Sequence, residues 1–396
     1  MSEADWALVL NLHQPSDNIE AMTADQEWQA KEVLWAMDRI PRSLWTYEDV
    51  GRVHLSLSGT LLESLADPGF QERFYGVVDC GSLLWHLQNT AIIQVLGTGY
   101  YHPVFPLIPR ADWDEHLGRW KMLAGHLFSR DPFAGFWPPE MGFSMEMIPH
   151  LVRHGYRYVL VDSEHVRPVG SMRWDELRYR PHIARHDGSE IVVVVRDRDL
   201  SDAQESGMDP GWFTSEIAAR TRHCDFRPLV TTATDGENGG WFRNTTHNFW
   251  SLFHEPLMDR VRAGEAGLKP TFIDDHLDRY GAHGEVVVDE GAWNTGWHHG
   301  HGFVQWTGSS AQKEALARTA RVSAALRTMF ASTPPDSSRR HLLEEARWRL
   351  LRAETSCHFF WGEAWLDRCD QDLDEAERLI GADSSLLVGE PMTSDS

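Results

Sequence analysis

The sequence has few cysteines, no long hydrophobic run and no visible targeting segment. Its four cysteines, in a chain of 396 residues, have neither CxxC spacing nor the density of a disulfide-stabilised scaffold. No apolar stretch approaches the roughly 18 residues of a membrane-spanning helix. The acidic opening MSEADW is too short to be a signal peptide. We therefore predict a cytoplasmic protein with no membrane partner.

Positive charge is also scarce. Lysine and arginine number 37 against 59 aspartates and glutamates, which gives a formal net charge of −22. This charge repels nucleic acids and anionic membrane surfaces. The glycines form neither GxGxxG nor a P-loop, so a nucleotide site is not indicated. We predict a neutral or cationic substrate, no nucleic-acid partner and no cofactor, while the oligomeric state is left open.

Tryptophan, by contrast, is abundant. The chain contains 18 tryptophans, more than a core of this size needs. Indole rings pack well on the flat apolar faces of sugars. We therefore expect some of these side chains to line a surface groove.

Short apolar runs alternate with longer amphipathic stretches, as in βα units around a parallel sheet. Seven runs are visible, at residues 6–13, 53–59, 91–97, 134–138, 157–162, 191–196 and 228–234. Residues 286–289 are expected to add an eighth strand or to close an edge. From about residue 310 the pattern is helical without strands. A closed barrel and an open doubly wound sheet would both gather the strand ends at one side.

Glu140 follows one of these runs, in the segment GFWPPEMGFS. The two prolines before it fix the backbone and stiffen the approach to the carboxylate. A glutamate at a strand end is more often a helix cap or an ion-pair partner. The aromatic and proline setting favours instead a nucleophile in a sugar-cleaving site, where two carboxyl groups are needed.

Asp235 is the candidate for the second carboxyl group, in TATDGENGGWF. The surrounding glycines allow a ligand to approach the backbone closely. A bare Asp-Gly pair is more often a turn, but Trp241 follows in the same segment and favours a sugar-facing loop. Glu237 is expected to bind sugar hydroxyls or to tune the ionisation of Asp235, with a solvated surface position as the alternative.

Two histidines also follow strand-like runs. His13, with Gln14 beside it, ends the first run, and His102 lies in GTGYYHP after the third. A single histidine in such a place is more often structural than catalytic. Alternatively, His13, Gln14 and His102 hold sugar hydroxyls, with Tyr100 as a stacking ring.

The segment WHHGHG, with His298, His299 and His301, is the one indication of a metal. A zinc site also needs converging spacing and usually a carboxylate or cysteine. We favour a loop over the groove, in which Trp297 faces sugar, and predict no metal. Trp293 and Trp306 are expected to face the sugar in the same way.

Five segments resemble, in order, the signatures of glycoside hydrolase family 57. They are LNLHQP, GTGYYHP, GFWPPE, TATDGENGGWF and AETSCHFFWG. This family comprises retaining α-glucan-active enzymes, including α-amylases, 4-α-glucanotransferases and branching enzymes. The resemblance implies a seven-stranded (β/α) barrel, irregular and TIM-like, followed by a C-terminal helical region. It divides the chain into a catalytic barrel at 1–308, helices at 309–385 that pack on the barrel mouth, and a polar tail at 386–396.

The resemblance also implies roles for individual residues. Glu140 matches the family's nucleophile and Asp235 its general acid/base. Substrate-binding places of the family are matched by His13, Trp137, Trp241, Phe360 and Trp361. The sequence departs from the family at His102 and Pro103, where many members have a carboxylate, and at Gly239, where phenylalanine is common.

The expected function is therefore cleavage of α-1,4 linkages in an α-glucan or maltooligosaccharide by double displacement. The enzyme would act as a hydrolase of the α-amylase type or as a glucanotransferase. Two alternatives stay open. One is a metal-dependent polysaccharide deacetylase, and the other is a carbohydrate-binding protein without catalysis.

Overall fold

Parallel strands form the centre of the molecule. The computed structural model describes residues 3–129, 133–205, 208–237, 249–295 and 302–381. Seven strands follow one another in the order β3-β2-β1-β9-β8-β5-β4. Their bounds are β1 (Ala4–Leu12), β2 (Val53–Leu57), β3 (Ile93–Leu96), β4 (Gly135–Phe136), β5 (Tyr158–Asp162), β8 (Ser189–Arg196) and β9 (Leu229–Asp235). All seven runs seen in the sequence are thus confirmed as strands.

The two end strands of this order meet, which nearly closes a barrel. Gly97, directly after β3, pairs in parallel with Phe136 of β4. Its N–H donates to the Gly135 carbonyl at 2.9 Å, and its carbonyl accepts from the Trp137 N–H at 2.8 Å. A Cβ atom at Gly97 would lie 2.2 Å from the Tyr156 hydroxyl, so only glycine allows this approach.

The barrel strands are apolar on both faces because both faces are covered. On β1, Leu8 and Leu10 point outward into the core beneath the helices. Ala7 and Val9, between them, point inward and pack in a second cluster with Trp137. This alternation explains why the strands read as continuous apolar runs rather than as alternating ones.

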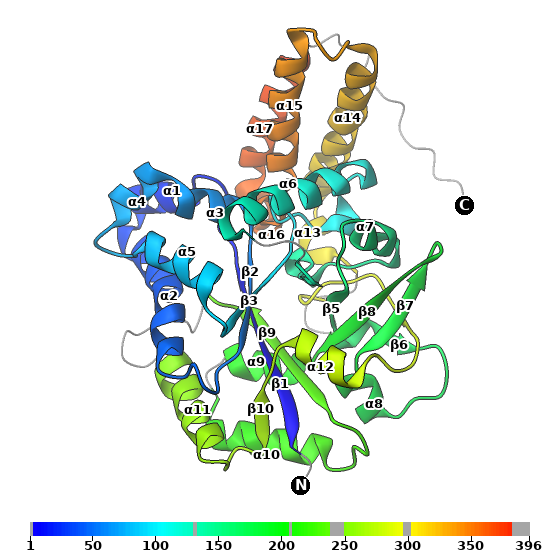
Figure 1. Cartoon of the computed structure of the whole chain (residues 1–396). Coiled ribbons are helices and arrows are strands. Elements are labelled where there is room, and N and C mark those ends of the chain that lie inside the picture. Colours follow the sequence, from blue (N-terminus) through cyan, green and yellow to red (C-terminus); the bar gives the residue numbers. More distant parts are fainter. Residues whose placement is uncertain (1–2, 130–132, 206–207, 238–248, 296–301, 382–396) are drawn as a thin grey trace.

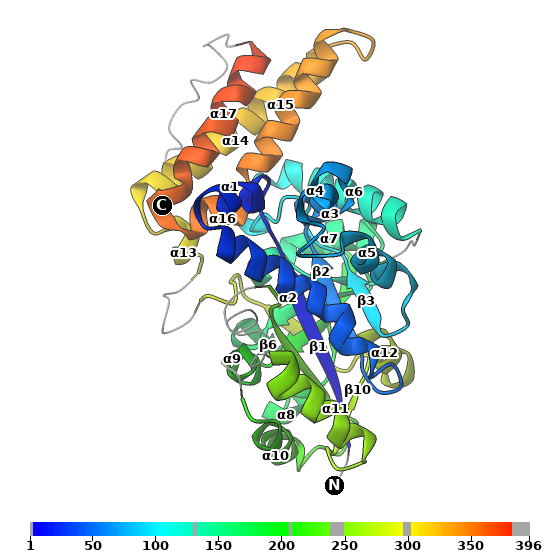
Figure 2. The ribbon, with the colours of Figure 1, turned by 90° about the vertical axis from the view of Figure 1, so that its left-hand side faces the viewer.

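Helices surround the barrel on its outside (Figures 1 and 2). They are α1 (Asn18–Asp25), α2 (Glu27–Trp45), α3 (Gly59–Ala66), α4 (Pro68–Phe74), α5 (Cys80–Asn89), α6 (Arg110–Phe128), α7 (Ile148–Arg153), α8 (Trp174–Tyr179), α9 (Arg198–Glu205), α10 (Pro210–Thr221), α11 (Glu255–Arg262) and α12 (Ile273–Tyr280). Short 3-10 turns include η1 (Phe105–Leu107), η2 (Pro139–Met141), η3 (Met145–Met147) and η4 (Ser163–His165), and a π-turn, η6 (Trp250–His254), precedes α11. Capping side chains set several starts: Ser58 accepts from the Leu61 N–H at α3, and Asp209 from the Trp212 N–H at α10.

Among the described residues, four further strands lie outside the seven-stranded barrel, and one of them differs from the sequence prediction. The 286–289 segment is a strand, β11 (Val286–Val288), but it pairs antiparallel with β6 (Val166–Pro168) in a separate sheet. It is therefore not an eighth barrel strand. β7 (His182–His186) pairs antiparallel with β8, and β10 (Leu268–Pro270) pairs parallel with the start of β1.

The C-terminal part is helical, as expected. Its elements are α13 (Val304–Thr307), α14 (Ser310–Ser332), α15 (Arg339–Ala353), α16 (Ser356–Phe360), η7 (Gly362–Trp365) and α17 (Leu366–Ile380). Three long helices, α14, α15 and α17, pack on one another around their own apolar core and project from one end of the barrel (Figure 1). In the described part of the chain, no helix has the length and apolarity needed to span a bilayer.

Candidate active site

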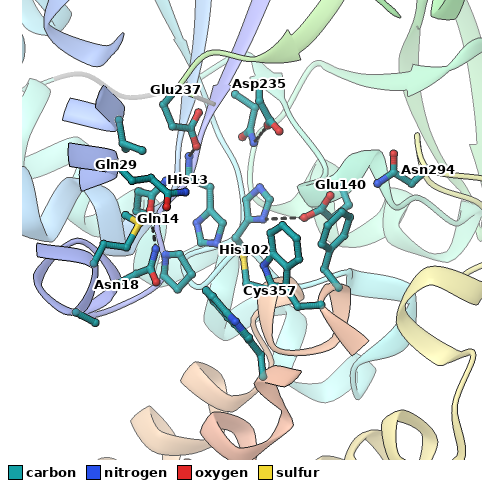
Figure 3. A pocket seen from close by; sticks show the side chains of 18 of the residues that line it. His13, Gln14, Asn18, Gln29, His102, Glu140, Asp235, Glu237, Asn294 and Cys357 are labelled. Carbon is teal, nitrogen blue, oxygen red and sulfur yellow. Dashed lines mark hydrogen bonds and ion pairs between the residues drawn. The ribbon is translucent and has the colours of Figure 1, made fainter. Parts of the chain in front are cut away.

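A pocket of about 680 Å³ lies at the carboxyl ends of the barrel strands. Its walls come from the ends of β1 and β9, from α1 and α2, and from α16, η7 and α17 (Figure 3). The residues with polar or aromatic side chains that carry the argument are Asn11, His13, Gln14, His102, Glu140, Asp235, Glu237, Trp293, Cys357, Phe360, Trp361 and Trp365. The barrel and the C-terminal helices therefore build this pocket together.

Glu140 is held rigidly. It lies in η2 with φ 57°, a left-handed conformation that is uncommon for a non-glycine residue. The Trp293 indole N–H donates to its Oε2 at 2.9 Å, and the Ser356 hydroxyl donates to its Oε1 at 2.8 Å. Burial and the nearby Asp235 carboxylate raise the pKa of Glu140 to about 7, although the two donors lower it. The carboxyl is thus buried, oriented and coupled to a second acid.

Asp235 is the last residue of β9, and the β1–β9 register places it opposite Asn11. The Asn11 side-chain amide donates to Asp235 Oδ1 at 3.0 Å. Both carboxyl groups, Glu140 and Asp235, line the same pocket. The two acids that the sequence singled out, 95 residues apart in numbering (235 − 140), therefore meet in one cavity.

Glu237 supplies a third carboxyl group in the pocket. One of its oxygens accepts from the His13 backbone N–H at 2.9 Å, and the other has no hydrogen-bond partner among the described residues. The side chain is buried. Burial, followed by the charge of Asp235, raises the pKa of Glu237 well above its usual range. The solvated surface position considered for Glu237 is therefore wrong.

His13 and His102 stack face to face beside these acids (Figure 3). Their ring centroids are 4.0 Å apart and their planes differ by 10°. Burial lowers the pKa of His13 well below its usual value, and that of His102 to about 3. Both nitrogens of His13 and Nε2 of His102 lack a partner within the described ranges. These neutral rings can accept or donate hydrogen bonds to a polar ligand.

A buried ion-pair network supports the loop that carries Trp293. Asp162, at the end of β5, accepts from Arg196 at 2.7 Å and from Arg198 at 2.8 Å. Arg198 in turn donates to the backbone carbonyl of Thr295. The position of the Trp293 indole against Glu140 thus depends on charges at the ends of two neighbouring strands.

Three further residues predicted from the sequence as substrate contacts are part of the pocket wall. Gln14, Phe360 and Trp361 line the pocket. Trp241, Trp297 and the histidines at 298, 299 and 301 fall outside the described residues.

Three aromatic residues differ from the expectation. Tyr100 is buried in the core rather than in the pocket wall, because its ring packs against Gly59 and Trp348. Trp137 is buried inside the barrel, with its ring centroid 5.4 Å from that of Trp293. Trp306 packs in the core of the C-terminal helices and does not face a sugar.

Four residues of the site were missed from the sequence: Asn11, Ser356, Cys357 and Trp365. The first three lie within the segments LNLHQP and AETSCHFFWG, but their types gave no reason to choose them. Among the residues that the structure describes, no group of three or more His, Cys, Asp or Glu side chains is arranged to hold a metal ion. The four cysteines are free thiols.

Comparison with curated proteins gives partial matches. The chain is 20% identical over 203 residues to "Alpha-amylase 1" of Dictyoglomus thermophilum, covering 50% of this chain and 28% of that protein. It is 25% identical over 195 residues to a "4-alpha-glucanotransferase" of Thermococcus kodakarensis, covering 49% of this chain and 27% of that protein. The matches thus span less than a third of these relatives' length.

Solved structures show the same fold over nearly the whole chain. A 4-alpha-glucanotransferase from Thermococcus litoralis matches with a TM-score of 0.71 at 16% identity, over 96% of this chain and 60% of that one. A branching enzyme from Pyrococcus horikoshii matches with a TM-score of 0.71 at 14% identity, over 96% and 88%. The sequence profile of "Glycosyl hydrolase family 57" matches residues 11–288. The chain therefore belongs to glycosyl hydrolase family 57.

Proposed function

We propose that this protein is a retaining glycosidase that acts on α-1,4 linkages of α-glucans, as a hydrolase or as a glucanotransferase. The observation that carries the proposal is that Glu140 and Asp235 line one pocket. Each oxygen of the Glu140 carboxylate accepts a hydrogen bond, one from Trp293 and the other from Ser356. Retaining glycosidases need such a pair, with about 5 to 5.5 Å between the carboxyl groups.

In the first step, a Glu140 oxygen attacks the anomeric carbon while Asp235 gives its proton to the leaving glycosidic oxygen. Glu140 suits the role of nucleophile because two hydrogen-bond donors stabilise its ionised form. Two acids coupled in one pocket do not both ionise readily, and the mechanism requires Glu140 to be the ionised one and Asp235 to carry the proton when substrate is bound. The product is a covalent glycosyl-enzyme and a released sugar hydroxyl.

In the second step, Asp235 acts as a base. It takes a proton from water or from the hydroxyl of another sugar, and that oxygen displaces Glu140 from the anomeric carbon. Water as acceptor gives hydrolysis, and a sugar acceptor gives transfer. The balance between them depends on how well bound acceptor excludes water from the pocket.

The chemistry of the pocket supports a neutral polysaccharide as substrate. Phe360, Trp361 and Trp365 offer rings on one wall, and buried polar groups on His13 and Glu237 without partners in the described structure face the interior. Sugars combine flat apolar faces with many hydroxyls, which matches both features. Family relatives named as α-amylases and glucanotransferases make α-glucans the first substrates to test.

The decisive experiment replaces Glu140 with glutamine. We expect Glu140→Gln to lower kcat/KM on maltooligosaccharides by about 10⁴-fold or more, since the covalent route is lost. Glu146→Gln, which changes an exposed side chain on the η3 turn, is the matched control and keeps the wild-type rate. A Glu140→Gln protein that retains near-wild-type activity contradicts the assignment.

Asp235→Asn tests the second acid. Its rate should fall less on substrates whose leaving group needs no protonation than on natural glucans. Chromatography of the wild-type products then separates the two activities: products both longer and shorter than the substrate indicate transfer, and only shorter ones indicate hydrolysis.

A further inference from the structure

The Ser356 side chain lies between the proposed nucleophile and a buried histidine. Its hydroxyl is 2.8 Å from Glu140 Oε1 and 3.1 Å from His102 Nδ1. The three residues come from distant parts of the chain: His102 follows β3, Glu140 lies in η2, and Ser356 begins α16. The C-terminal helical region thereby reaches the centre of the barrel mouth.

Counting protons determines the direction of these two hydrogen bonds. A hydroxyl has one proton to donate. When Glu140 is ionised it can only accept, so the Ser356 proton points to Oε1. The remaining contact then requires His102 Nδ1 to carry a proton and donate to Ser356 Oγ. If Glu140 were protonated, both bonds would reverse and His102 Nδ1 would become the acceptor.

Backbone contacts hold the pair in place. The Ser356 N–H donates to the His102 carbonyl at 3.0 Å, and the neighbouring residues Pro103 and Thr355 pair antiparallel. His102 itself has φ 57°, a conformation kept only where the surroundings determine it. Both residues are buried, so water does not compete for their hydrogen bonds. The contact is therefore a fixed part of the site.

His102 acts here as a neutral donor. Burial lowers its pKa to about 3, so it carries no charge at ordinary pH. The other groups facing Glu140 are the Asp235 carboxyl and the Cys357 thiol, with Glu237 and His13 beyond them. Burial raises the pKa of Cys357 far above its usual range, so the thiol also stays neutral. Burial and the charge of Asp235 oppose a charge on Glu140, and the hydrogen bonds from Ser356 and Trp293 favour it.

We propose that Ser356 and His102 are positioning residues for the nucleophile: the His102 Nδ1–H fixes the Ser356 hydroxyl so that it donates to Glu140 and favours the ionised form of this carboxylate. The inference rests on the proposed function, because it gives Glu140 the role of nucleophile. It assigns the pair no direct contact with the substrate. Neither residue needs to change charge during turnover.

The kinetic test is the pH dependence of kcat/KM in Ser356→Ala. A hydrogen bond to a charged group contributes enough to shift a midpoint by about one to two pH units. Removing it should move the acid limb upward by that amount, so that the rate loss is about 10-fold or more larger below the midpoint than above it. Ser356→Thr keeps a hydroxyl and should keep the wild-type midpoint. A loss of equal size at every pH would overturn the proposal.

Variants at His102 test the donor atom. Asparagine places an amide N–H near the position of Nδ1, whereas glutamine reaches only toward Nε2. His102→Asn should keep the acid-limb midpoint, whatever its effect on the rate, and His102→Gln should raise it. Equal midpoints in the two variants would show that the Nδ1 donor has no part in the ionisation of Glu140.

A titration without substrate separates this inference from the proposed function. The titration is followed by NMR in protein labelled with ¹³C at the glutamate carboxyl carbon. The Glu140 signal is identified as the one that is absent from the spectrum of the Glu140→Gln variant. Its midpoint should rise in Ser356→Ala and stay in Ser356→Thr. If wild type cleaves no α-glucan, the proposed function fails while this shift still supports the hydrogen-bond arrangement. An unchanged midpoint overturns the inference even when the enzyme is active.

Discussion

Two groups of acids, buried or partly buried, lie near each other in this molecule and differ in what surrounds them. Glu140 and Asp235 face the pocket. Glu354, at the end of α15, lies behind it with Asp112 and His116 of α6. Burial raises the pKa of Glu140 and of Glu354, with a neighbouring aspartate as the second cause in each case.

The second group is closed to solvent. His116 Nε2 lies 2.9 Å from Glu354 Oε2, and both side chains are fully buried. Burial lowers the pKa of His116 to about 3, and burial together with Asp112 raises that of Glu354 well above its usual range. His116 and Glu354 are therefore both neutral: the imidazole N–H donates, and Glu354 keeps its proton. It joins α6 to the segment that carries Ser356.

The comparison shows that a raised carboxyl pKa alone does not identify an active site. The two groups of acids differ in their access to solvent and in whether nearby polar atoms lack hydrogen-bond partners. The pocket contains buried nitrogens on His13 and an oxygen on Glu237 that lack partners in the described part of the chain. The Glu354 cluster has no opening through which a sugar can reach it. We therefore expect the first group to govern rate and the second to govern stability.

The largest effect on stability should come from Glu354→Ala. This change leaves a cavity and an unpaired His116 N–H, and should lower the free energy of unfolding by about 3 kcal/mol. Glu354→Gln is the matched control and should cost less than about 1 kcal/mol, because the amide oxygen still accepts from His116. Denaturant titration measures both. Equal losses in the two variants would mean that Glu354 carries a charge.

A smaller effect concerns the pH dependence of stability at Glu140. Its pKa of about 7 lies above the ordinary value, so the folded state binds this proton more tightly than the unfolded state. The associated stability is present at low pH and is lost as pH rises through about 7. The stability of Glu140→Gln relative to wild type should therefore rise by about 3 kcal/mol between pH 4.5 and pH 8. A pH-independent difference would place the Glu140 titration near its ordinary range.

The smallest effect is expected on substrate affinity, from an exposed aromatic residue of the pocket wall. Trp361 is 56% exposed on the pocket wall, and its ring lies 5.0 Å from that of Phe360. Trp361→Ala should raise KM for maltooligosaccharides about fivefold with little change in kcat, as for a contact equal in substrate and transition state. Trp85, 54% exposed on α5 away from the pocket, is the control. A matching KM change in Trp85→Ala would make the effect unspecific.

The barrel was readable from the sequence because its strands are buried on both faces and therefore appear as unbroken apolar runs. β6, β7 and β10 were not, since they are short and mix buried with exposed residues. The segment 286–289 was recognised as a strand, but its partner β6 lies more than a hundred residues earlier, beyond what a local pattern can indicate.

The two acids could be named from the sequence because each lies in a distinctive loop of prolines, glycines and aromatics. Their partners could not. Trp293 and Ser356 reach Glu140 from 153 and 216 residues away, and only the folded chain shows those contacts. Tyr100 illustrates the opposite error: an aromatic residue in a motif-like segment serves packing rather than binding.

The closure at Gly97 places the nucleophile next to a narrow seam of the barrel, where, in the described part of the chain, a single bridge joins the two end strands. Glu140 lies three residues after Trp137, whose backbone N–H donates to the Gly97 carbonyl across that seam. Few backbone hydrogen bonds of the described residues join the barrel at this seam, and the rings of Tyr156 and Tyr158 pack against Gly97 and Gly135 there. Loss of this ring packing on heating should disturb first the turn that bears Glu140. We therefore expect activity to be lost at a lower temperature than the fold of the barrel.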